Sequence, residues 1–229
     1  MFRITFSGDR QFCASKSPTS CSCKPLGASL KDDKDRRQRM IDNLLNYCSK
    51  FIQLTELDKD AINLNFKPIT LKRKDFLLKE GMVCDFVAFL NSGVIRHYHI
   101  KDGNEITCDI TLHNNFITDF KSLTQNTPTN YYFQILKDAE LFVIKKNNLL
   151  RLYAENRNIE SFGRIMAEQV AQRTIDIAMS LSSDRPEERV EKLIKQRHDL
   201  FQEVPQRYLA NLLGISPESL SRIRARRKS

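Results

Sequence analysis

The chain has 229 residues, and 41% of them are apolar, which is enough to bury one or two ordinary hydrophobic cores. It carries 37 Lys and Arg residues against 28 Asp and Glu residues, and the net charge of +9 favours a polyanionic partner, either nucleic acid or an anionic membrane surface. No apolar run reaches the roughly 18 residues that span a bilayer, and the N-terminus lacks the apolar core of a secretory signal, so we expect a cytoplasmic protein with no membrane partner.

The first 39 residues show little apolar periodicity and contain the charge run KDDKDRRQR. We therefore expect residues 1–39 to be a disordered or non-native N-terminal extension, and one open interpretation is that translation starts at Met40. Cys13, Cys21 and Cys23 lie in this segment without a C-x2-C pair or a nearby His, so we predict no metal site and no cofactor there. The segment MIDNLLNYCSKFIQL has helical apolar spacing and predicts a first helix that begins at Met40.

Between residues 66 and 145 the apolar period changes to two, which is typical of strands. Asp102 and Gly103 separate two alternating runs and predict a hairpin, while Gly81 and Gly93 are interpreted as turn residues. In EITCDITL, we expect one face to point to the core, with Ile106, Cys108, Ile110 and Leu112. The density of short strands predicts an antiparallel β-roll domain over residues 40–154, with strands at FLLKEG, FVAFLNSG, VIRHYHI, EITCDITL, YYFQILKD and ELFVIKK.

A long amphipathic helix is predicted over residues 155–183. It is longer than packing on a small roll requires, so we expect part of its apolar stripe to meet a second copy of the chain; burial wholly within its own domain is the alternative. The predicted dimer interface consists of Ile159, Phe162, Met166, Val170 and Ile177. SSDRP at 182–186 breaks the pattern and places a proline at the start of the next helix, so a separate domain is expected over residues 184–229.

The C-terminal segment LANLLGISPESLSRIRARRKS has the features of a helix-turn-helix. Gly214 falls where the turn needs a left-handed backbone, Ser216 is a favourable N-cap, and Pro217 occupies the first helical position. Short polar groups and arginines then follow, which suits contacts to DNA bases and phosphates. The predicted DNA-binding residues are Gln206, Arg207, Ser216, Pro217, Glu218, Ser219, Ser221, Arg222, Arg224 and Arg226.

The order of helix, antiparallel roll, long helix and helix-turn-helix resembles the Crp-Fnr family of bacterial transcription regulators over residues 41–228. The motif GISPESLSRI is similar to the recognition helix of that family, and Glu218, Ser221 and Arg222 fall on its E-x-x-S-R positions. The resemblance implies that Arg222 contacts a guanine, that Glu218 accepts from a cytosine or orients Arg222, and that Ser221 lies near a thymine. It also implies a homodimer on an inverted repeat, with RNA polymerase and a small-molecule effector as further partners.

The fold class that follows from this resemblance is α+β, with an N-terminal cyclic-nucleotide-binding-like β-roll, a long dimerisation helix and a C-terminal helix-turn-helix domain. One departure concerns the β-hairpin wing of better-known members. Little sequence between Phe201 and Gln206 is available to form it, so we expect little or no wing.

In the cyclic-AMP branch of that family, a Gly-Glu pair and an Arg-Ser pair of the roll hold the nucleotide. The arginine neutralises the phosphate and the carboxylate binds the ribose hydroxyl. The corresponding positions here are Thr118 and Asp119, and about Thr129 and Asn130, which we interpret as a degenerate effector pocket. Without an arginine a buried phosphate would lack its charge partner, so we predict no tight binding of cyclic AMP or cyclic GMP.

A metal-binding alternative comes from another feature of the roll. His97 and His99 share one face of a predicted strand, and Glu105 lies just beyond the hairpin, which resembles half of the metal motif of cupin enzymes. The second half of that motif is missing. We therefore expect a regulator and not an enzyme, with the cupin-like metalloprotein as the alternative.

Overall fold

The computed structural model describes residues 26–226, and the residues from Arg36 onward form one compact unit. Helix α1 (Leu26–Cys48) begins before Met40, so the prediction that the helix starts at Met40 is wrong. The extra turns include two Lys and three Arg residues, which have high helix propensity. The buried part starts at Met40, Ile41 and Leu44 as the apolar spacing indicated. Cys13, Cys21 and Cys23 lie outside the described residues.

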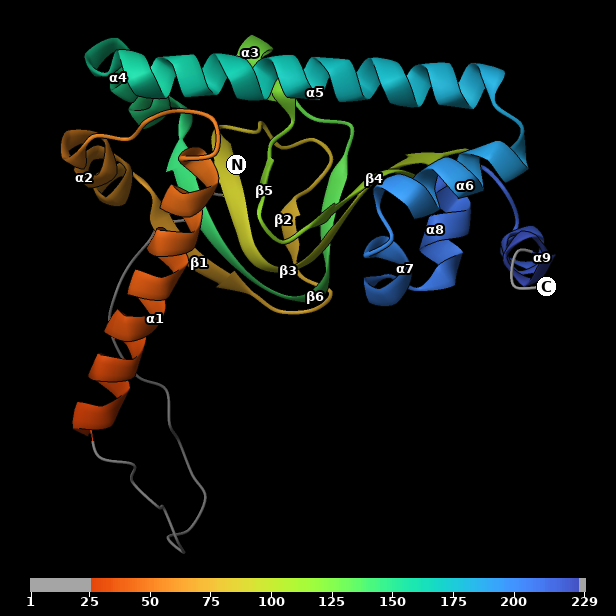
Figure 1. Ribbon diagram of the computed structural model, residues 1–229, viewed down its shortest axis with the longest axis horizontal. Helices are drawn as coiled ribbons and strands as arrows, with labels where there is room; N and C mark the ends of the chain where they lie inside the picture. The colour runs from red at the N-terminus through yellow and green to blue at the C-terminus, as the bar shows by residue number, and fades with distance from the viewer. Residues whose placement is uncertain (1–25, 227–229) are drawn as a thin grey trace, which may run out of the picture. The chain divides into compact units, whose positions relative to one another are not determined.

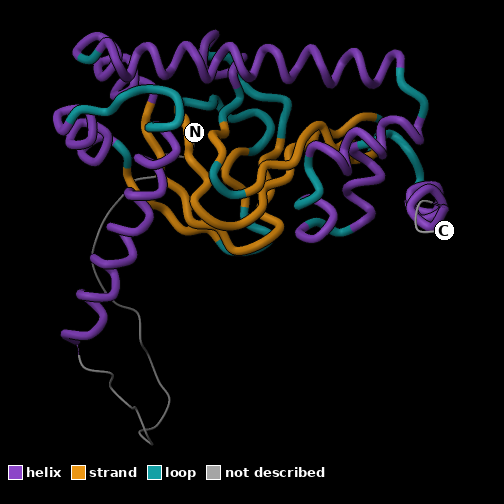
Figure 2. Tube along the Cα trace, viewed as in Figure 1, coloured by secondary structure: helices purple, strands orange, loops and turns teal. Residues whose placement is uncertain are grey.

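The centre of the fold is a six-stranded antiparallel sheet formed by β1 (Lys67–Leu71), β2 (Phe76–Leu78), β3 (Phe86–Lys101), β4 (Asn104–Leu112), β5 (Asn115–Ile117) and β6 (Tyr132–Lys145). The main strand order is β1-β6-β3-β4, while β2 pairs with β6 and β5 with β3. Strands β3 and β4 are joined by the predicted hairpin, in which Asp102 and Gly103 both have positive φ. All strands lie between residues 67 and 145, and helices alone follow them in the described chain (Figure 2).

Two predicted strand breaks do not occur. FVAFLNSG and VIRHYHI form the single strand β3, and the two segments after Tyr132 form the single strand β6. Gly93 lies inside β3 with φ +107°, where the register to β6 shifts, so it forms a bulge and not a turn. A Cβ at Gly93 would lie 2.6 Å from the Asp138 carbonyl oxygen, which explains why glycine is required at this close approach.

The predicted alternation of β4 also fails at its start. Ile106 is 37% exposed whereas Thr107 is buried, although Ile110 and Leu112 face the core as expected. Cys108 is partly exposed. The pairing of β4 with β3 shifts between His97 and Tyr98, so Thr107, opposite Tyr98, lies on the same face as Ile110, opposite Arg96. This bulge reverses the alternation, which buries Thr107 and leaves Ile106 exposed.

Helices surround the sheet and continue beyond it (Figure 1): α2 (Glu56–Asn65), α3 (Phe120–Gln125), α4 (Lys146–Glu155), α5 (Arg157–Ser183), α6 (Pro186–Gln196), α7 (Leu200–Glu203), α8 (Gln206–Leu212) and α9 (Pro217–Arg226). Helices α1, α2, α4 and the first turns of α5 pack with Phe89 and Phe142 of the sheet in one apolar cluster. The helix predicted over 155–183 is α5, and Pro186 opens α6. The predicted α+β fold is therefore confirmed, and no strand interrupts the helices over residues 186–226, where a wing would lie. None of the helices within residues 26–226 is long and apolar enough to cross a membrane.

Candidate functional site

The helix-turn-helix is formed by α8, a tight turn and α9. Gly214 has φ +67° in that turn, the left-handed conformation that glycine adopts without steric cost. Helix α9 is capped because the Ser219 backbone amide donates to the Ser216 Oγ at 3.2 Å. The apolar residues that join the two helices are buried in one core, with Leu209, Ala210, Leu213 and Leu220.

The face predicted to read bases is exposed on α9. Glu218, Ser221 and Arg222 follow the i, i+3, i+4 spacing, so they share one side of the helix, and all three side chains are exposed. Hydrogen bonds from its own backbone amide and then from the Ser216 hydroxyl lower the pKa of Glu218, which keeps this carboxylate ionised at neutral pH. The helix thus presents an acceptor, a hydroxyl and a guanidinium together.

The other predicted DNA-binding residues differ in their exposure and in their contacts with the rest of the chain. Gln206 Nε2 donates to the Pro217 carbonyl at 2.9 Å and links the starts of the two helices, whereas Arg207 and Arg226 are exposed. Arg224 is only partly exposed, because its guanidinium lies over the Phe201 ring at 5.2 Å from the centroid. Arg227 and Lys228 lie outside the described residues.

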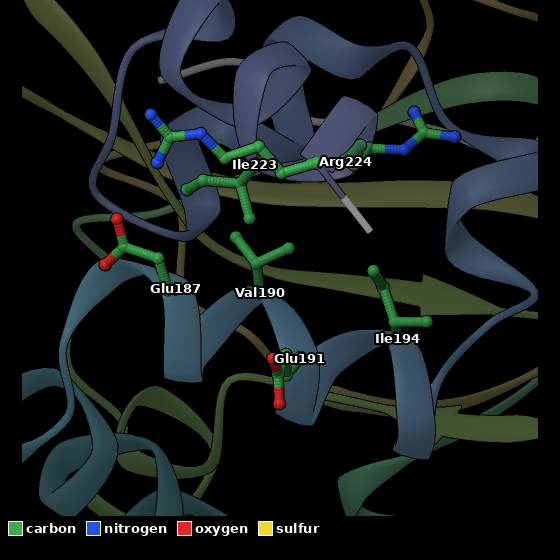
Figure 3. A pocket seen from close by; sticks show the side chains of 7 residues that line it. Glu187, Val190, Glu191, Ile194, Ile223 and Arg224 are labelled. Carbon is green, nitrogen blue, oxygen red and sulfur yellow. The ribbon is translucent and has the colours of Figure 1, made fainter. Parts of the chain in front are cut away.

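The buried side of α9 packs against α6 (Figure 3). Val190 and Ile194 of α6 lie opposite Ile223 of α9 around a small pocket of about 210 Å³. The apolar contact between α6 and α9 holds α9 on its buried side and leaves its polar side exposed to solvent.

The C-terminal helices share a core with the roll. Val94, Ile110 and Leu112 of β3 and β4 belong to the same buried cluster as the apolar residues of α6 to α9. The Thr107 backbone amide donates to the Asn211 Oδ1 at 2.5 Å, which joins β4 to α8. The helix-turn-helix is therefore docked on the roll.

Arg96 of β3 is the largest buried polar side chain of this contact, with 2% exposure. Its guanidinium carbon lies 4.4 Å from the ring centroids of both Tyr98 and Tyr208, and Tyr208 belongs to α8. It also pairs with Glu105 and donates to the Thr107 Oγ1 at 2.9 Å. The guanidinium thus contacts two aromatic rings and is also hydrogen-bonded, which compensates for its loss of water.

A second feature is a cavity of about 800 Å³ between α5 and the roll. Its walls come from β3, β4, the segment around α3, and helices α4 and α5. Most lining side chains are apolar, among them Val87, Phe116, Leu149, Phe162 and Met166. A cavity of this size and character suits a small organic ligand.

The polar end of the cavity contains His97, Asp109, Thr111 and Arg173. Arg173 Nη2 of α5 lies 2.6 Å from Asp109 Oδ1, and Arg197 Nη1, at the end of α6, lies 3.8 Å from the same oxygen. Burial and then the positive charge of Arg173 lower the pKa of Arg197 from its usual value. Asp109 of the roll therefore contacts both the long helix and the C-terminal domain.

His97 lines the cavity and shares a hydrogen bond with the Thr111 hydroxyl at 2.9 Å. Burial lowers its pKa to about 4, an effect that Asp109 opposes and that Arg173 and Arg197 reinforce. At neutral pH the ring is uncharged.

The four residues predicted as a degenerate effector pocket do not gather around the cavity. Thr118 lines it and donates to the Phe86 carbonyl at 2.8 Å. Asp119 instead caps α3 through the Ser122 amide and accepts from the Thr129 Oγ1 at 2.5 Å, while Asn130 is exposed. Sequence reasoning missed Asp109 and Arg173 because neither residue belongs to a local motif. The two side chains come into contact only when α5 packs across the roll.

The residues of the metal-binding alternative have other partners. His97 contacts Thr111, and the His99 Nδ1 lies 3.1 Å from the Cys108 Sγ. Glu105 pairs with Arg96 on the side of α8. Among residues 26–226, no group of three or more His, Cys, Asp or Glu side chains is placed to hold a metal ion.

The predicted dimer residues divide into two groups. Ile159 and Phe162 are buried in the core of their own chain, so they are not available to a second copy, which corrects the prediction for these two. Met166 is partly buried, whereas Val170 is 50% exposed and Ile177 is 36% exposed. The first turns of α5 pack on the roll, whereas the apolar side chains of the later turns are exposed to solvent in the single chain.

The cyclic nucleotide-binding domain family matches residues 68–156 of the chain. No match was found among curated proteins.

Solved structures show the same fold. FixK2 from Bradyrhizobium japonicum is similar with a TM-score of 0.62 and 15% identity, covering 70% of this chain and 83% of that one. A CooA variant from Carboxydothermus hydrogenoformans has a TM-score of 0.61 and 16% identity, covering 77% and 86%. A protein from Eubacterium rectale, described as a transcriptional regulator of the crp/fnr family, has a TM-score of 0.57 and 16% identity, covering 74% and 82%. Residues 68–156 are therefore similar to cyclic nucleotide-binding domains, and the chain shares the fold of these three structures, as its sequence predicted.

Proposed function

We propose that this protein is a transcription regulator that binds an inverted-repeat DNA site as a homodimer. The observation that carries the proposal is the exposed triplet Glu218, Ser221 and Arg222 on one side of a capped, core-anchored α9. An ionised carboxylate can accept from a cytosine amino group, and a guanidinium can donate to both acceptors of a guanine. The triplet is therefore suited to reading bases in the major groove.

The remaining DNA-binding residues supply the contacts that fix the register on the duplex. Arg207 and Arg226 are exposed cations, and the start of α9 offers backbone amides to a phosphate. Ser216 and Ser219 are polar groups at the same end. Contact with RNA polymerase stays a prediction from the family resemblance.

The homodimer is supported by the open part of α5. Apolar or small residues follow one another there at alternating spacings of three and four, which is the seam pattern of a coiled coil: Ala167, Val170, Thr174, Ile177 and Leu181. Val170 and Leu181 are 50% and 52% exposed in the single chain. A second α5 would cover them and would place two copies of α9 roughly 34 Å apart, one turn of DNA.

Control by cyclic AMP is not part of the proposal. Thr129 and Asn130 stand where the family's phosphate-binding pair is expected, and Asp119 is already engaged by the Thr129 hydroxyl. A cyclic phosphate would find no guanidinium at this place, and an uncompensated buried charge weakens binding strongly.

Selection of bound sequences from a random DNA pool tests the function. We expect an inverted repeat, and we expect Arg222→Ala to relax one guanine position per half-site at a cost of about 1–3 kcal/mol. The matched control Arg226→Ala removes an exposed cation of the same helix. It should lower the affinity for all DNA sequences equally and leave the selected motif unchanged. Recovery of no enriched motif by the wild-type protein would show that the proposal is wrong.

A further inference from the structure

We propose that Arg189 of α6 is a positioning residue, which ties the turn of the helix-turn-helix to the end of α5 and thereby sets the half-site spacing that the dimer accepts. The inference rests on the proposed homodimer and adds a determinant of its specificity that lies outside the reading face. Helix α5 carries the seam of that dimer, and α9 carries the reading face. A rigid link between the end of α5 and α9 therefore constrains how far apart the two copies of α9 lie.

The guanidinium of Arg189 joins two backbone carbonyls from different elements. Its Nη1 donates to the Asp184 carbonyl at 2.8 Å, and Asp184 is the C-cap of α5. Its Nε donates to the Leu213 carbonyl at 3.1 Å, and Leu213 is the C-cap of α8. The last carbonyls of a helix have no partner within that helix, so one arginine here satisfies two helix ends at once.

The turn between α8 and α9 leaves the Leu213 carbonyl to Arg189. The Gly214 and Ile215 amides donate to carbonyls of α8 at 3.1 and 3.0 Å, which is the Schellman pattern. Those two bonds use carbonyls earlier in α8 and not that of Leu213. Arg189 therefore holds the turn from a third helix, immediately before the residues that start α9.

A second cation of α6 contacts the same end of α5. Lys192 Nζ lies 2.6 Å from Asp184 Oδ2, which also accepts from the Ser180 hydroxyl at 2.5 Å. Arg189 and Lys192 are three residues apart, so they lie on one face of α6. Both bring positive charge to the C-terminal end of α5, where the helix dipole is negative. Charge-assisted contacts thus join α6 to α5 in addition to the chain itself.

The planar guanidinium makes the link directional. Two donors in one plane fix the relative orientation of the two carbonyls that they bind, whereas an ammonium acts as a point charge. The contact of Val190 and Ile194 with Ile223 (Figure 3) holds α9 on α6 without such directionality, because the hydrophobic effect depends on buried area. We therefore expect that a lysine, which conserves the charge, does not replace Arg189.

Binding to DNA sites with altered spacers tests the inference. One added base pair shifts a half-site by about 3.4 Å and turns it by roughly 35°. The dissociation constant for a repeat whose spacer is one base pair longer is divided by that for the repeat selected by the wild type. We expect this spacing ratio to be about tenfold lower in Arg189→Lys, because directional charge-assisted hydrogen bonds are lost. An isolated half-site should bind both proteins equally, since the charge and the reading face are kept.

Two further variants control the test. Lys195→Gln removes an exposed cation near the other end of α6 and should keep the spacing ratio of the wild type. Lys192→Gln removes the second contact to Asp184 and should lower the ratio about twofold. The Lys192 side chain is 54% exposed, so this variant still decides if Arg189→Lys does not fold. Unchanged ratios in Arg189→Lys and Lys192→Gln would overturn the proposal, as would a loss of half-site affinity that accounts for the whole effect of Arg189→Lys.

The wild type separates this inference from the function on which it rests. If the wild type binds a half-site as tightly as the repeat, it has no spacing preference, and the proposed dimeric DNA binding is wrong. If the wild type prefers one spacing and Arg189→Lys keeps that preference, the proposed function stands and only the role of Arg189 is refuted.

Discussion

Arg96 and His97 are neighbours in β3 but face different surroundings. Successive side chains of a strand point to opposite faces, so Arg96 is stacked against Tyr208 of α8 while His97 lines the cavity under α5. The guanidinium is paired with Glu105, and the imidazole is held neutral.

The lowered pKa of His97 makes stability depend on pH. The unfolded chain binds a proton at His97 near pH 6.5, whereas the folded chain does so only near pH 4, so the free energy of unfolding falls as the pH drops through this window. The loss amounts to about 3 kcal/mol at most, because part of the ring borders the cavity.

Urea unfolding at several pH values checks this prediction. His97→Gln should flatten the slope between pH 6.5 and pH 4, which are the two pKa values of the histidine. The control His113→Gln replaces an exposed histidine and should behave like the wild type. If the pH dependence of the free energy of unfolding is unchanged in His97→Gln, groups other than His97 cause it.

At the scale of elements, α5 has two roles along its length. Its first turns complete the core of the roll through Ile159 and Phe162, and its later turns expose Val170, Ile177 and Leu181. This exposed apolar row is the surface that the proposed homodimer would cover.

Ile177→Glu tests that element. Two carboxylates would be buried without partners in each dimer, so we expect the dimer dissociation constant to rise by about 100-fold or more. Ile175→Glu is the matched control, because Ile175 is 56% exposed but lies off the seam. Sedimentation of both variants measures the change, and a dimer that tolerates Ile177→Glu as well as Ile175→Glu would refute the seam.

At the scale of the whole molecule, the helix-turn-helix is coupled to the roll through a few named contacts. The Arg96 stack and the Asn211 contact to Thr107 join α8 to the sheet, and Arg197 joins the end of α6 to Asp109. Asp109 also holds Arg173 of α5. Asp109 of β4 therefore lies within reach of cations from both α5 and the end of α6.

Tyr208→Ala tests this coupling. Loss of the ring removes one face of the Arg96 stack, about 1–2 kcal/mol, and should separate the unfolding of the C-terminal helices from that of the roll. Calorimetric scans should then show a second transition at lower temperature. Tyr208→Phe keeps the ring and loses only the hydroxyl that Arg207 contacts at 2.8 Å, so it should retain the single transition. Identical scans of the two variants would exclude the stack as the link.

The sequence by itself determined the features that depend on local spacing. Neighbours in the chain set the Asp102-Gly103 hairpin, the length of α5, and the cap and turn of the helix-turn-helix, and each is present. The exposed reading face of α9 follows from the same helical spacing. Local conformational preferences are sufficient to favour these features, so they can be predicted without knowledge of distant contacts.

Only the tertiary structure decided which faces are covered. Thr107 is buried and Ile106 exposed because the pairing of β4 with β3 contains a bulge, and Gly93 is a bulge because β6 passes close to it. Arg173 and Asp109 are 64 residues apart and form the polar end of the cavity only when α5 crosses the roll. Burial and charge pairing depend on contacts between distant segments, and no period along the chain encodes them.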